Sequence, residues 1–263
     1  MDVNRRTVWI TGASSGIGEA LAYVLAERGA KLILSARRRQ VLEELVRSLP
    51  RPEEHAVVPL DLTSGDGLEQ LALDVEREHG PLDVLINNGG VSQRGLATDT
   101  EMAVVRRIME TNFFGAVALS RGVLPGMLER GRGKLVIVSS VVGKFATPKR
   151  STYAASKHAL HGYFDALRLE VQERGIGVTL VCPGYVRTQV SQNALGPDGS
   201  PHMRLDKGQE GGTSAEAAAL RIVKAIGADE KEVYFGGREV LGVYAKRFVP
   251  SLFDRVLQRV NPT

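Results

Sequence analysis

The regular alternation of short apolar runs with segments of helical periodicity limits the fold more than any other feature of the chain. Runs of mostly apolar residues recur along the sequence, and apolar residues between them return every three or four positions. Apolar strands that alternate with helices are typical of a parallel sheet with helices on both faces. We expect strands at 7–10, 31–35, 56–60, 82–86, 134–138, 177–181 and 233–235, and helices at 16–28, 38–49, 65–78, 101–129 and 152–173.

The length of the chain indicates a single domain. Its 263 residues suit one large α/β unit, and the sequence shows no internal repeat and no clear linker. We therefore expect one doubly wound α/β domain over residues 1–263, with a sheet of about seven strands. A stretch rich in Gly, Pro and Ser, about 189–214, is predicted to form a lid over a site, with a plain surface excursion as the alternative.

Composition excludes several classes of protein. The net charge of +4 is too small by itself to indicate nucleic-acid binding, so no nucleic-acid partner is expected. The single cysteine, Cys182, cannot form an internal disulfide, and no metal site is expected. The chain begins without the apolar run of a signal peptide, and no window is long and apolar enough to span a membrane. We therefore expect a cytoplasmic protein.

Residues 11–18, Thr-Gly-Ala-Ser-Ser-Gly-Ile-Gly, form a glycine-rich turn between the first expected strand and the first expected helix. Glycine lets the backbone turn tightly and approach a pyrophosphate, and the helix N-terminus offers free amides and the positive end of the helix dipole. This placement predicts dinucleotide binding, with a simple tight turn as the alternative. The residues expected to bind the cofactor here are Gly12, Ser14, Ser15, Gly16, Ile17 and Gly18.

A tyrosine and a lysine are placed to transfer a proton. Tyr153 and Lys157 are four residues apart in an expected helix, so their side chains share one face. A tyrosine pKa of about 10 is too high for a base at neutral pH, but a nearby ammonium group stabilises the phenolate. Tyr153 can then donate or accept a proton. This spacing is common by chance. Two further residues strengthen a catalytic interpretation, namely Ser140, thirteen residues before Tyr153, and Asn112.

The turn pattern Thr-Gly-x-x-x-Gly-x-Gly and these four side chains resemble the short-chain dehydrogenase/reductase family over about residues 7–188. The resemblance implies a Rossmann-like fold and hydride transfer between a nicotinamide and a carbonyl or secondary alcohol. It implies that Ser140 polarises the carbonyl and that Tyr153 transfers the proton. Lys157 would lower the Tyr153 pKa and hold the nicotinamide ribose. Asn112 would hold a water for proton relay, with a purely structural asparagine as the alternative.

The same resemblance implies further contacts to the cofactor. Asp61 is expected near the adenine, although it can equally cap the next helix. The family pattern Asn-Asn-Ala-Gly is Asn-Asn-Gly-Gly here, and the departure at Gly89 is expected to loosen the turn without abolishing binding. Together with Tyr153 and Lys157, the implied contacts are Asp61, Leu62, Asn88, Gly90, Pro183, Gly184, Val186 and Thr188.

The end of the second expected strand predicts which dinucleotide binds. An acidic residue near this point favours NAD, whereas an arginine favours the 2′-phosphate of NADP. No carboxylate occurs at 35–39, and Arg37 and Arg38 follow Ala36. A guanidinium can grip a phosphate in bidentate fashion, so we expect NADP(H) over NAD(H), with Arg37 the main contact and Arg38 the second. A solvated helix start is the alternative.

The substrate is less defined by the sequence. Beside Ser140, the expected substrate contacts are Gln93, Arg94, Phe145 and Tyr185, with ordinary surface charge as the alternative for Arg94. The stretch Gly-Gly-Val-Ser-Gln-Arg-Gly at 89–95 resembles the membrane-associated branch called dehydrogenase/reductase member seven. That likeness implies a hydrophobic substrate such as a ketone, a 3-oxoacyl group or a steroid- or retinoid-like molecule.

The C-terminal segment, about 240–260, has apolar residues at helical spacing with basic residues between them. It can cover its own subunit or a partner, which we favour, or it can lie on an anionic membrane surface. The family further implies a homodimer or homotetramer. Two other functions stay open, a non-catalytic dinucleotide-binding regulator and a membrane-peripheral or partner-binding protein that acts through this segment.

Overall fold

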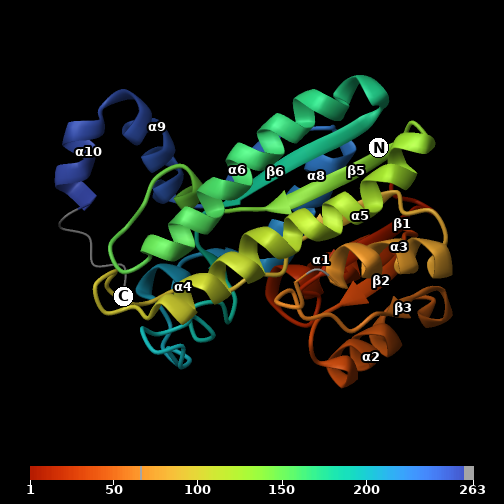
Figure 1. Ribbon diagram of the computed structural model, residues 1–263, viewed down its shortest axis with the longest axis horizontal. Helices are drawn as coiled ribbons and strands as arrows, with labels where there is room; N and C mark the ends of the chain where they lie inside the picture. The colour runs from red at the N-terminus through yellow and green to blue at the C-terminus, as the bar shows by residue number, and fades with distance from the viewer. Residues whose placement is uncertain (66, 258–263) are drawn as a thin grey trace.

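A single parallel sheet organises the protein. The computed structural model describes residues 1–65 and 67–257, with only the backbone of residue 207, and over these residues seven strands form one sheet in the order β3-β2-β1-β4-β5-β6-β9 (Figure 1). Every pairing in this sheet is parallel. The strands are β1 (Thr7–Thr11), β2 (Lys31–Ser35), β3 (Ala56–Val57), β4 (Val84–Asn87), β5 (Gly133–Val138), β6 (Ile176–Pro183) and β9 (Glu232–Phe235).

Helices cover both faces of this sheet, and each face has its own core. Because successive side chains of a strand point to opposite faces, Val8 and Ile10 of β1 pack into one core and Trp9 into the other. The first core is closed by α1 (Gly16–Glu27), α2 (Arg39–Ser48) and α8 (Ala215–Gly227). The second is closed by α3 (Gly67–His79), α5 (Gly115–Glu129) and α6 (Ser151–Val171).

The strand order reverses beside β1, and this reversal creates the place for a ligand. The chain runs from β1 outward to β2 and β3, and then returns to β4 on the other side of β1. Ligands of open parallel sheets bind beyond the carboxyl ends of the strands at such a switch point. The turn after β1 and the turn after β4 meet there, and these are the two turns that the sequence assigned to cofactor binding.

The long helix expected at 101–129 contains an irregularity. The structure forms α4 (Met102–Met109), then a π-helical turn at Glu110–Phe114, and then α5. In that turn the Gly115 amide donates to the Glu110 carbonyl, five residues back. Such insertions of one residue into a helix are frequent at functional sites, and Asn112 lies inside this one.

The other expected elements are confirmed, with two differences. β3 is only two residues long, although the Val58 amide still donates to the Leu34 carbonyl at 3.1 Å, beyond its end. Helix α8 was missed, because no element was assigned between the expected lid and the expected strand at 233–235. Its signal was present at Ser214, whose hydroxyl accepts a hydrogen bond from the Ala217 amide at 3.1 Å and caps the helix.

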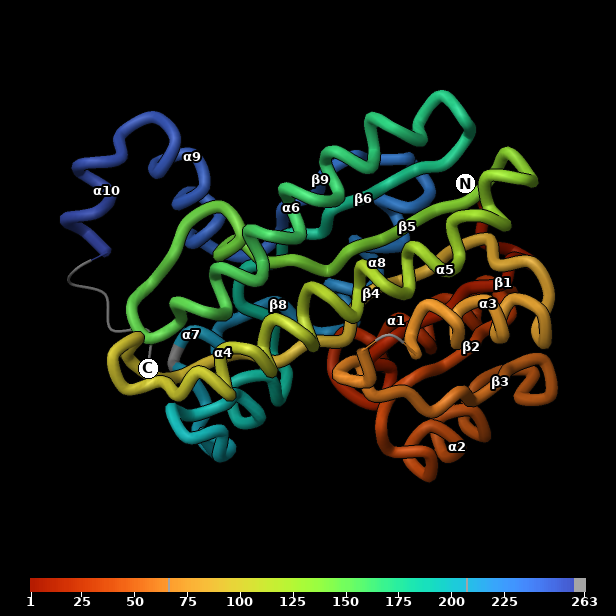
Figure 2. Tube along the Cα trace, viewed as in Figure 1, coloured from red at the N-terminus to blue at the C-terminus, as the bar shows by residue number. Residues whose placement is uncertain are grey.

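The expected lid, 189–214, forms a loop whose two ends lie side by side. Short strands β7 (Val186–Arg187) and β8 (Thr213–Ser214) pair with each other and hold its two ends together, and α7 (Lys207–Glu210) is its helical turn. Figure 2 shows this segment beside α4. The contact is apolar, since Leu195 packs with Val104 and Ile108 of α4.

The C-terminal segment forms two short helices, α9 (Leu241–Phe248) and α10 (Pro250–Leu257), which lie apart from the sheet (Figure 1). The helices meet at Pro250, as the sequence indicated, and residues 258–260 of the expected segment lie outside the described residues. The inner face packs against the segment that follows β5, where the rings of Phe253 and Phe145 meet edge to face with centroids 5.3 Å apart. In the part of the chain that the structure describes, no helix is long and apolar enough to cross a bilayer.

Candidate active site

The glycine-rich turn is packed so closely that side chains are excluded from it. Gly12 has φ of +65°, and a Cβ there would lie 2.8 Å from the Cα of Gly89. A Cβ on Gly18 would lie 2.3 Å from the Gly12 carbonyl oxygen. The backbone is therefore bare at the start of α1, where amides and the helix dipole favour a phosphate. The turn fits the pyrophosphate of a dinucleotide.

The two arginines after β2 are both exposed, but they reach different neighbours. Arg38 donates from Nη2 to Ser14 Oγ at 3.3 Å and to the Ser14 carbonyl at 3.4 Å, so it lies against the glycine-rich turn. Asp61 accepts hydrogen bonds from the Thr63 amide at 3.0 Å and the Thr63 hydroxyl at 2.8 Å. The hydrogen bond from the Thr63 amide is the main cause that lowers the pKa of Asp61, and the nearby Arg37 guanidinium lowers it further. Asp61 thus shapes its own turn, which differs from the capping of the next helix kept as its alternative, since α3 begins only at Gly67. Its contact with the adenine stays a prediction.

Thr11 holds the turn after β4 in place. Its hydroxyl accepts hydrogen bonds from the amides of Asn88 at 3.1 Å and Gly89 at 2.9 Å. The Asn88 side chain donates to the carbonyl oxygens of Thr11 at 3.0 Å and Gly12 at 3.2 Å. At Gly89, the space of an alanine methyl is filled by Leu62, whose Cδ1 lies 2.6 Å from an ideal Cβ. The departure from the family pattern is therefore compensated by packing, and the turn is not loose.

An open cleft of about 830 Å³ extends from the glycine-rich turn to the lid. Thr188 closes it near the helix start, since its Cγ2 would lie 2.9 Å from a Cβ on Gly16. Pro183 ends β6, and Val186 lies in β7. The residues that line the cleft include Ser14, Ser15, Gly16, Tyr23, Arg38, Thr188, Gln192 and Leu205.

The catalytic candidates meet at the start of α6. The Lys157 ammonium lies 5.7 Å from the centroid of the Tyr153 ring, and the hydroxyls of Tyr153 and Ser140 share a hydrogen bond. Lys157 is buried and donates from Nζ to the Val138 carbonyl at 2.8 Å. The adjacent Ser139 hydroxyl instead bonds to the Lys157 carbonyl at 3.3 Å, so Ser140 is the serine that faces Tyr153.

Comparisons with known proteins bear on this constellation. Residues 6–197 match the family model described as short chain dehydrogenase. The chain is 42% identical, over 98% of its length and 83% of the relative's, to the dehydrogenase/reductase SDR family protein 7-like of Anopheles gambiae. The chain belongs to the short-chain dehydrogenase family. It lies near the member-seven branch, since the SDR family member 7B of Mus musculus is 41% identical over 95% of this chain and 79% of its own.

Solved structures of other short-chain dehydrogenases confirm the Rossmann-like fold. One from Burkholderia phymatum, crystallised in complex with NAD, has a TM-score of 0.82 and 25% identity, with 100% of this chain and 98% of that chain covered. The family and this likeness support a nicotinamide dinucleotide as the cofactor of an oxidoreductase that acts on CH–OH groups.

Burial governs the ionisation of the family's tyrosine and lysine in this chain. It lowers the pKa of Lys157 to about 8. Burial raises the pKa of the Tyr153 phenol, while the Arg150 guanidinium, the hydrogen bond with Ser140 and the Arg94 guanidinium lower it. The net direction for Tyr153 in this structure is upward. The lowering expected from the sequence also counts the positive charge of an oxidised nicotinamide, and it stays a prediction.

Asn112 is held by the backbone of the loop that follows β4. Its Oδ1 accepts from the Val91 amide at 2.8 Å, and its Nδ2 donates to the Val91 carbonyl and to Ser156 Oγ, each at 2.9 Å. These bonds use both amide protons and one of two acceptor positions on Oδ1. A Cβ on Gly90 would lie 3.1 Å from that oxygen and 3.7 Å from Lys157 Nζ, so the bare glycine leaves space between them.

Two of the expected substrate contacts serve other purposes. Gln93 is fully buried, and its Oε1 accepts from the Thr152 and Tyr153 amides at 2.8 and 3.3 Å, so it caps α6. Its assignment to substrate is therefore wrong. Arg94 is also buried, which excludes ordinary surface charge as its explanation.

Phe145 and Tyr185, the other expected substrate contacts, pack against neighbouring segments of the chain. Phe145 belongs to an apolar cluster with Val142, and Tyr153 packs against this cluster. Tyr185 is partly buried, and its ring atoms lie 2.6–2.8 Å from an ideal Cβ on Gly208 in the lid.

A buried polar cluster behind Ser139 was missed by the sequence reasoning. His161 Nε2 lies 3.1 Å from Ser139 Oγ and 3.7 Å from Cys182 Sγ, and Glu232 is the third member. Burial lowers the pKa of His161 to about 4 and raises that of Cys182, so imidazole and thiol are uncharged at neutral pH. The cluster joins α6, β6 and β9 through His161, Cys182 and Glu232.

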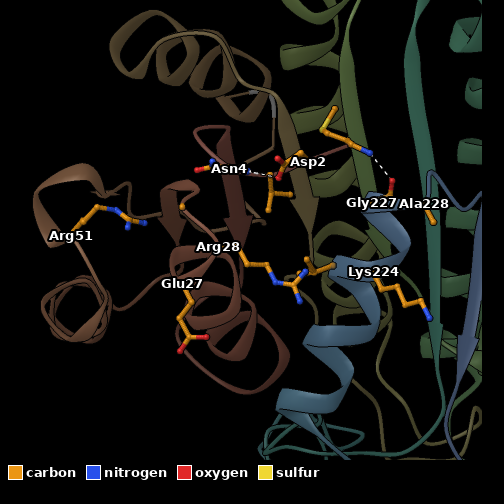
Figure 3. Close-up of a pocket in the computed structure, with 12 residues that line it drawn as sticks. Asp2, Asn4, Glu27, Arg28, Arg51, Lys224, Gly227 and Ala228 are labelled. Carbon is orange, nitrogen blue, oxygen red and sulfur yellow. Dashed lines mark hydrogen bonds between the residues drawn. The ribbon is translucent and has the colours of Figure 1, made fainter.

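A second hollow, of about 900 Å³, lies at the amino ends of the strands (Figure 3). Figure 3 shows Arg28, Lys224 and Glu27 on its walls, so charges of both signs line it. None of the catalytic candidates lines it. The catalytic candidates lie instead toward the carboxyl ends of the strands, with Ser140 after β5 and Lys157 bonded to the carbonyl of Val138 at the end of β5.

Proposed function

We propose that this protein is an NADP(H)-dependent oxidoreductase that interconverts a hydrophobic carbonyl compound and its secondary alcohol. The observation that carries the proposal is the meeting of Ser140, Tyr153 and Lys157 beside a bare glycine turn. When bound, the dinucleotide supplies or receives the hydride. The remaining chemistry, namely holding the substrate and moving one proton, falls to side chains of this chain.

Proton transfer is assigned to Tyr153. In reduction its hydroxyl donates a proton to the carbonyl oxygen, and in oxidation it takes the proton back. The Ser140 hydroxyl, hydrogen-bonded to Tyr153, lies where it can also donate to that oxygen and polarise the carbonyl. Lys157 supplies positive charge next to the ring, and the space beside Gly90 suits a water that links the lysine to Asn112.

The first experiment replaces the proton donor. We expect Tyr153→Phe to lose turnover with NADPH and a panel of apolar ketones, while NADPH affinity stays within about twofold. Equal turnover in both proteins would refute the proposed chemistry. NADPH binding without turnover in the unmodified protein across the panel would instead favour a dinucleotide-binding regulator.

The preference for NADP(H) rests on Arg37 and Arg38, with no carboxylate at the end of β2. Contact with Ser14 places Arg38 closest to the glycine-rich turn, so we propose Arg38 as the first phosphate ligand, ahead of Arg37. Titration with NADPH and NADH, followed by fluorescence transfer from Trp9, tests this. Charge-assisted hydrogen bonds contribute about 1.5–3 kcal/mol, so Arg38→Gln should weaken NADPH binding by roughly 10- to 150-fold and leave NADH unchanged. Equal loss for both would refute the assignment.

The substrate class, the oligomeric state and the cellular location are also proposals. An apolar substrate fits the cluster around Phe145 and the lid side chain Leu205, which is 53% exposed.

A homo-oligomer built on α4–α5 and α6 fits the exposed side chains Phe114 and Leu169, which are 50% and 69% exposed. Light scattering tests the oligomer, since a monomeric mass would refute it. A cytoplasmic location rests on composition alone, and cell fractionation tests it.

The outer face of α9 and α10 supports a second candidate, contact with an anionic membrane surface. Phe248 is 77% exposed, Leu252 is 61% exposed, and Arg247 and Arg255 lie on the same two helices. Basic amphipathic helices of this kind bind anionic bilayers. Phosphatidylserine vesicles should sediment the unmodified chain and not the variant with Phe248→Ser and Leu252→Ser. Equal sedimentation would exclude this surface.

A further inference from the structure

Three charged side chains are buried together between the catalytic helix and the lid. They come from separate segments: Arg94 from the loop after β4, Arg150 from the residue before α6, and Asp206 from the lid. Their side chains are only 3%, 7% and 1% exposed. Burying an ion costs several kcal/mol even after relaxation, and a buried ion pair is weak evidence for a gain in stability. Their burial next to Tyr153 therefore calls for another reason.

The three groups are bonded directly to one another. Arg94 donates from Nε to Asp206 Oδ1 at 3.1 Å and from Nη2 to Oδ2, in the two-pronged geometry that arginine favours with carboxylates. Arg150 donates from Nη2 to the same Oδ2 at 2.7 Å. Two guanidinium groups and one carboxylate leave a net charge of +1 inside the protein. Burial and the Arg94 charge lower the pKa of Arg150, but arginine stays protonated in proteins.

The position of Arg150 does not serve the helix that it precedes. A positive side chain at a helix N-terminus opposes the helix dipole, and Arg150 stands one residue before the start of α6. Its guanidinium lies 5.8 Å from the centroid of the Tyr185 ring. Tyr153 follows three residues later. The arginine thus lies one helical turn before the proton donor, at a cost to the helix, and its charge acts on Tyr153.

Charged and polar groups face Tyr153 from each element around it. Lys157 is on its own helix, Ser140 is on the turn after β5, and Arg94 and Arg150 act from the side of the lid. Asp206 is the carboxylate that touches both arginines. The two guanidinium groups favour the phenolate against the burial that opposes it.

We propose that Arg94, Arg150 and Asp206 form a second positively charged element of the active site, which favours the phenolate form of Tyr153 and whose net charge is set by the lid. The three are positioning residues, because they act through Tyr153. The proposal rests on the proposed function for its role in turnover. In this arrangement a residue of the lid adjusts the acidity of the proton donor, because Asp206 offsets part of the positive charge of Arg94 and Arg150.

The test uses substitutions that break the same bonds but change the charge in opposite directions. Arg150→Gln removes a positive charge and should raise the Tyr153 pKa, whereas Asp206→Asn removes a negative charge and should lower it. A unit charge at about 10 Å in an effective dielectric of about 20 changes a pKa by roughly 1. Arg150→Lys keeps the charge and should stay near the unmodified protein. Arg77→Gln, on an exposed side chain of α3, is the matched control.

The readout is the near-ultraviolet absorption of tyrosinate, titrated with pH on the full chain. Each variant is also made with Tyr153→Phe, and the difference between the two titrations belongs to Tyr153. Shifts of opposite sign support the proposal. Shifts of the same sign in Arg150→Gln and Asp206→Asn would mean that lid damage alone is responsible, and no shift in either would also overturn it.

A further pair keeps the test decisive where Asp206→Asn fails to fold. Arg94→Gln should then raise the Tyr153 pKa while Arg94→Lys leaves it unchanged, and equal behaviour of this pair would overturn the proposal. The titration needs neither substrate nor turnover. A failure of the proposed function, seen as unchanged turnover in Tyr153→Phe, is therefore distinguishable from a failure of the charge argument.

Discussion

Lys157 should make this protein more stable in mild alkali than at neutral pH. Its ammonium is buried, and burial lowers its pKa from 10.5 to about 8. Between these two values the folded chain has lost the proton while the unfolded chain still holds it. Stability rises with pH wherever the unfolded state binds more protons, so the free energy of unfolding should rise between pH 8 and 10.5.

The size of the effect follows from the difference between the two pKa values. Each pH unit in this window contributes about 1.4 kcal/mol, so the whole window contributes about 3 kcal/mol. Below pH 8 lysine is charged in both states, and its burial weakens the protein by the same constant amount.

The assay compares Tyr153→Phe with the double variant Tyr153→Phe/Lys157→Met, so that ionisation of Tyr153 contributes to neither protein. Urea unfolding is followed by the fluorescence of Trp9 at several pH values from 7 to 10.5. The difference in unfolding free energy should be flat up to about pH 8 and then move in favour of the lysine-containing chain. A difference that stays constant across this range would show that the lysine is not desolvated, and would refute the reasoning.

Three further outcomes follow from close contacts. Gly89→Ala places a methyl 2.6 Å from Leu62 Cδ1, the end of a flexible side chain, so we expect about 1–2 kcal/mol of destabilisation by urea unfolding with cofactor binding retained. Gly90→Ala fills the space beside the catalytic ammonium, and kcat should fall at least about tenfold in steady-state kinetics while NADPH affinity changes little; an unchanged kcat would show that no water is needed there. Phe253→Ala removes the edge-to-face contact with Phe145 and should cost about 1–3 kcal/mol, with α9 and α10 becoming sensitive to limited proteolysis.

The sequence predicts the sheet well because its strands are apolar and its helices periodic, and both signals are local. The candidates Ser140 and Tyr153 come from the resemblance to the family, and the structure places them after β5 and in the first turn of α6. It does not predict that Gln93 caps α6 or that Arg94 meets Asp206. Those contacts join residues that are 59 and 112 positions apart in the sequence. The sequence pattern around a polar loop residue is also the same whether its side chain binds the chain itself or a ligand.

The π-helical turn at Glu110–Phe114 makes the helix around Asn112 sensitive to length rather than to composition. A residue corresponds to about 100° of rotation in a helix, so removing one from this turn would rotate α4 by that angle relative to α5. If Asn112 kept its hydrogen bonds, Val104 and Ile108 would face away from Leu195 of the lid. If Val104 and Ile108 kept their contact with Leu195, Asn112 would lose its hydrogen bonds. A deletion of one residue here therefore breaks either the contact between α4 and the lid or the hydrogen bonds of Asn112. Many substitutions on the exposed side of the same helix leave both the contact and the hydrogen bonds in place.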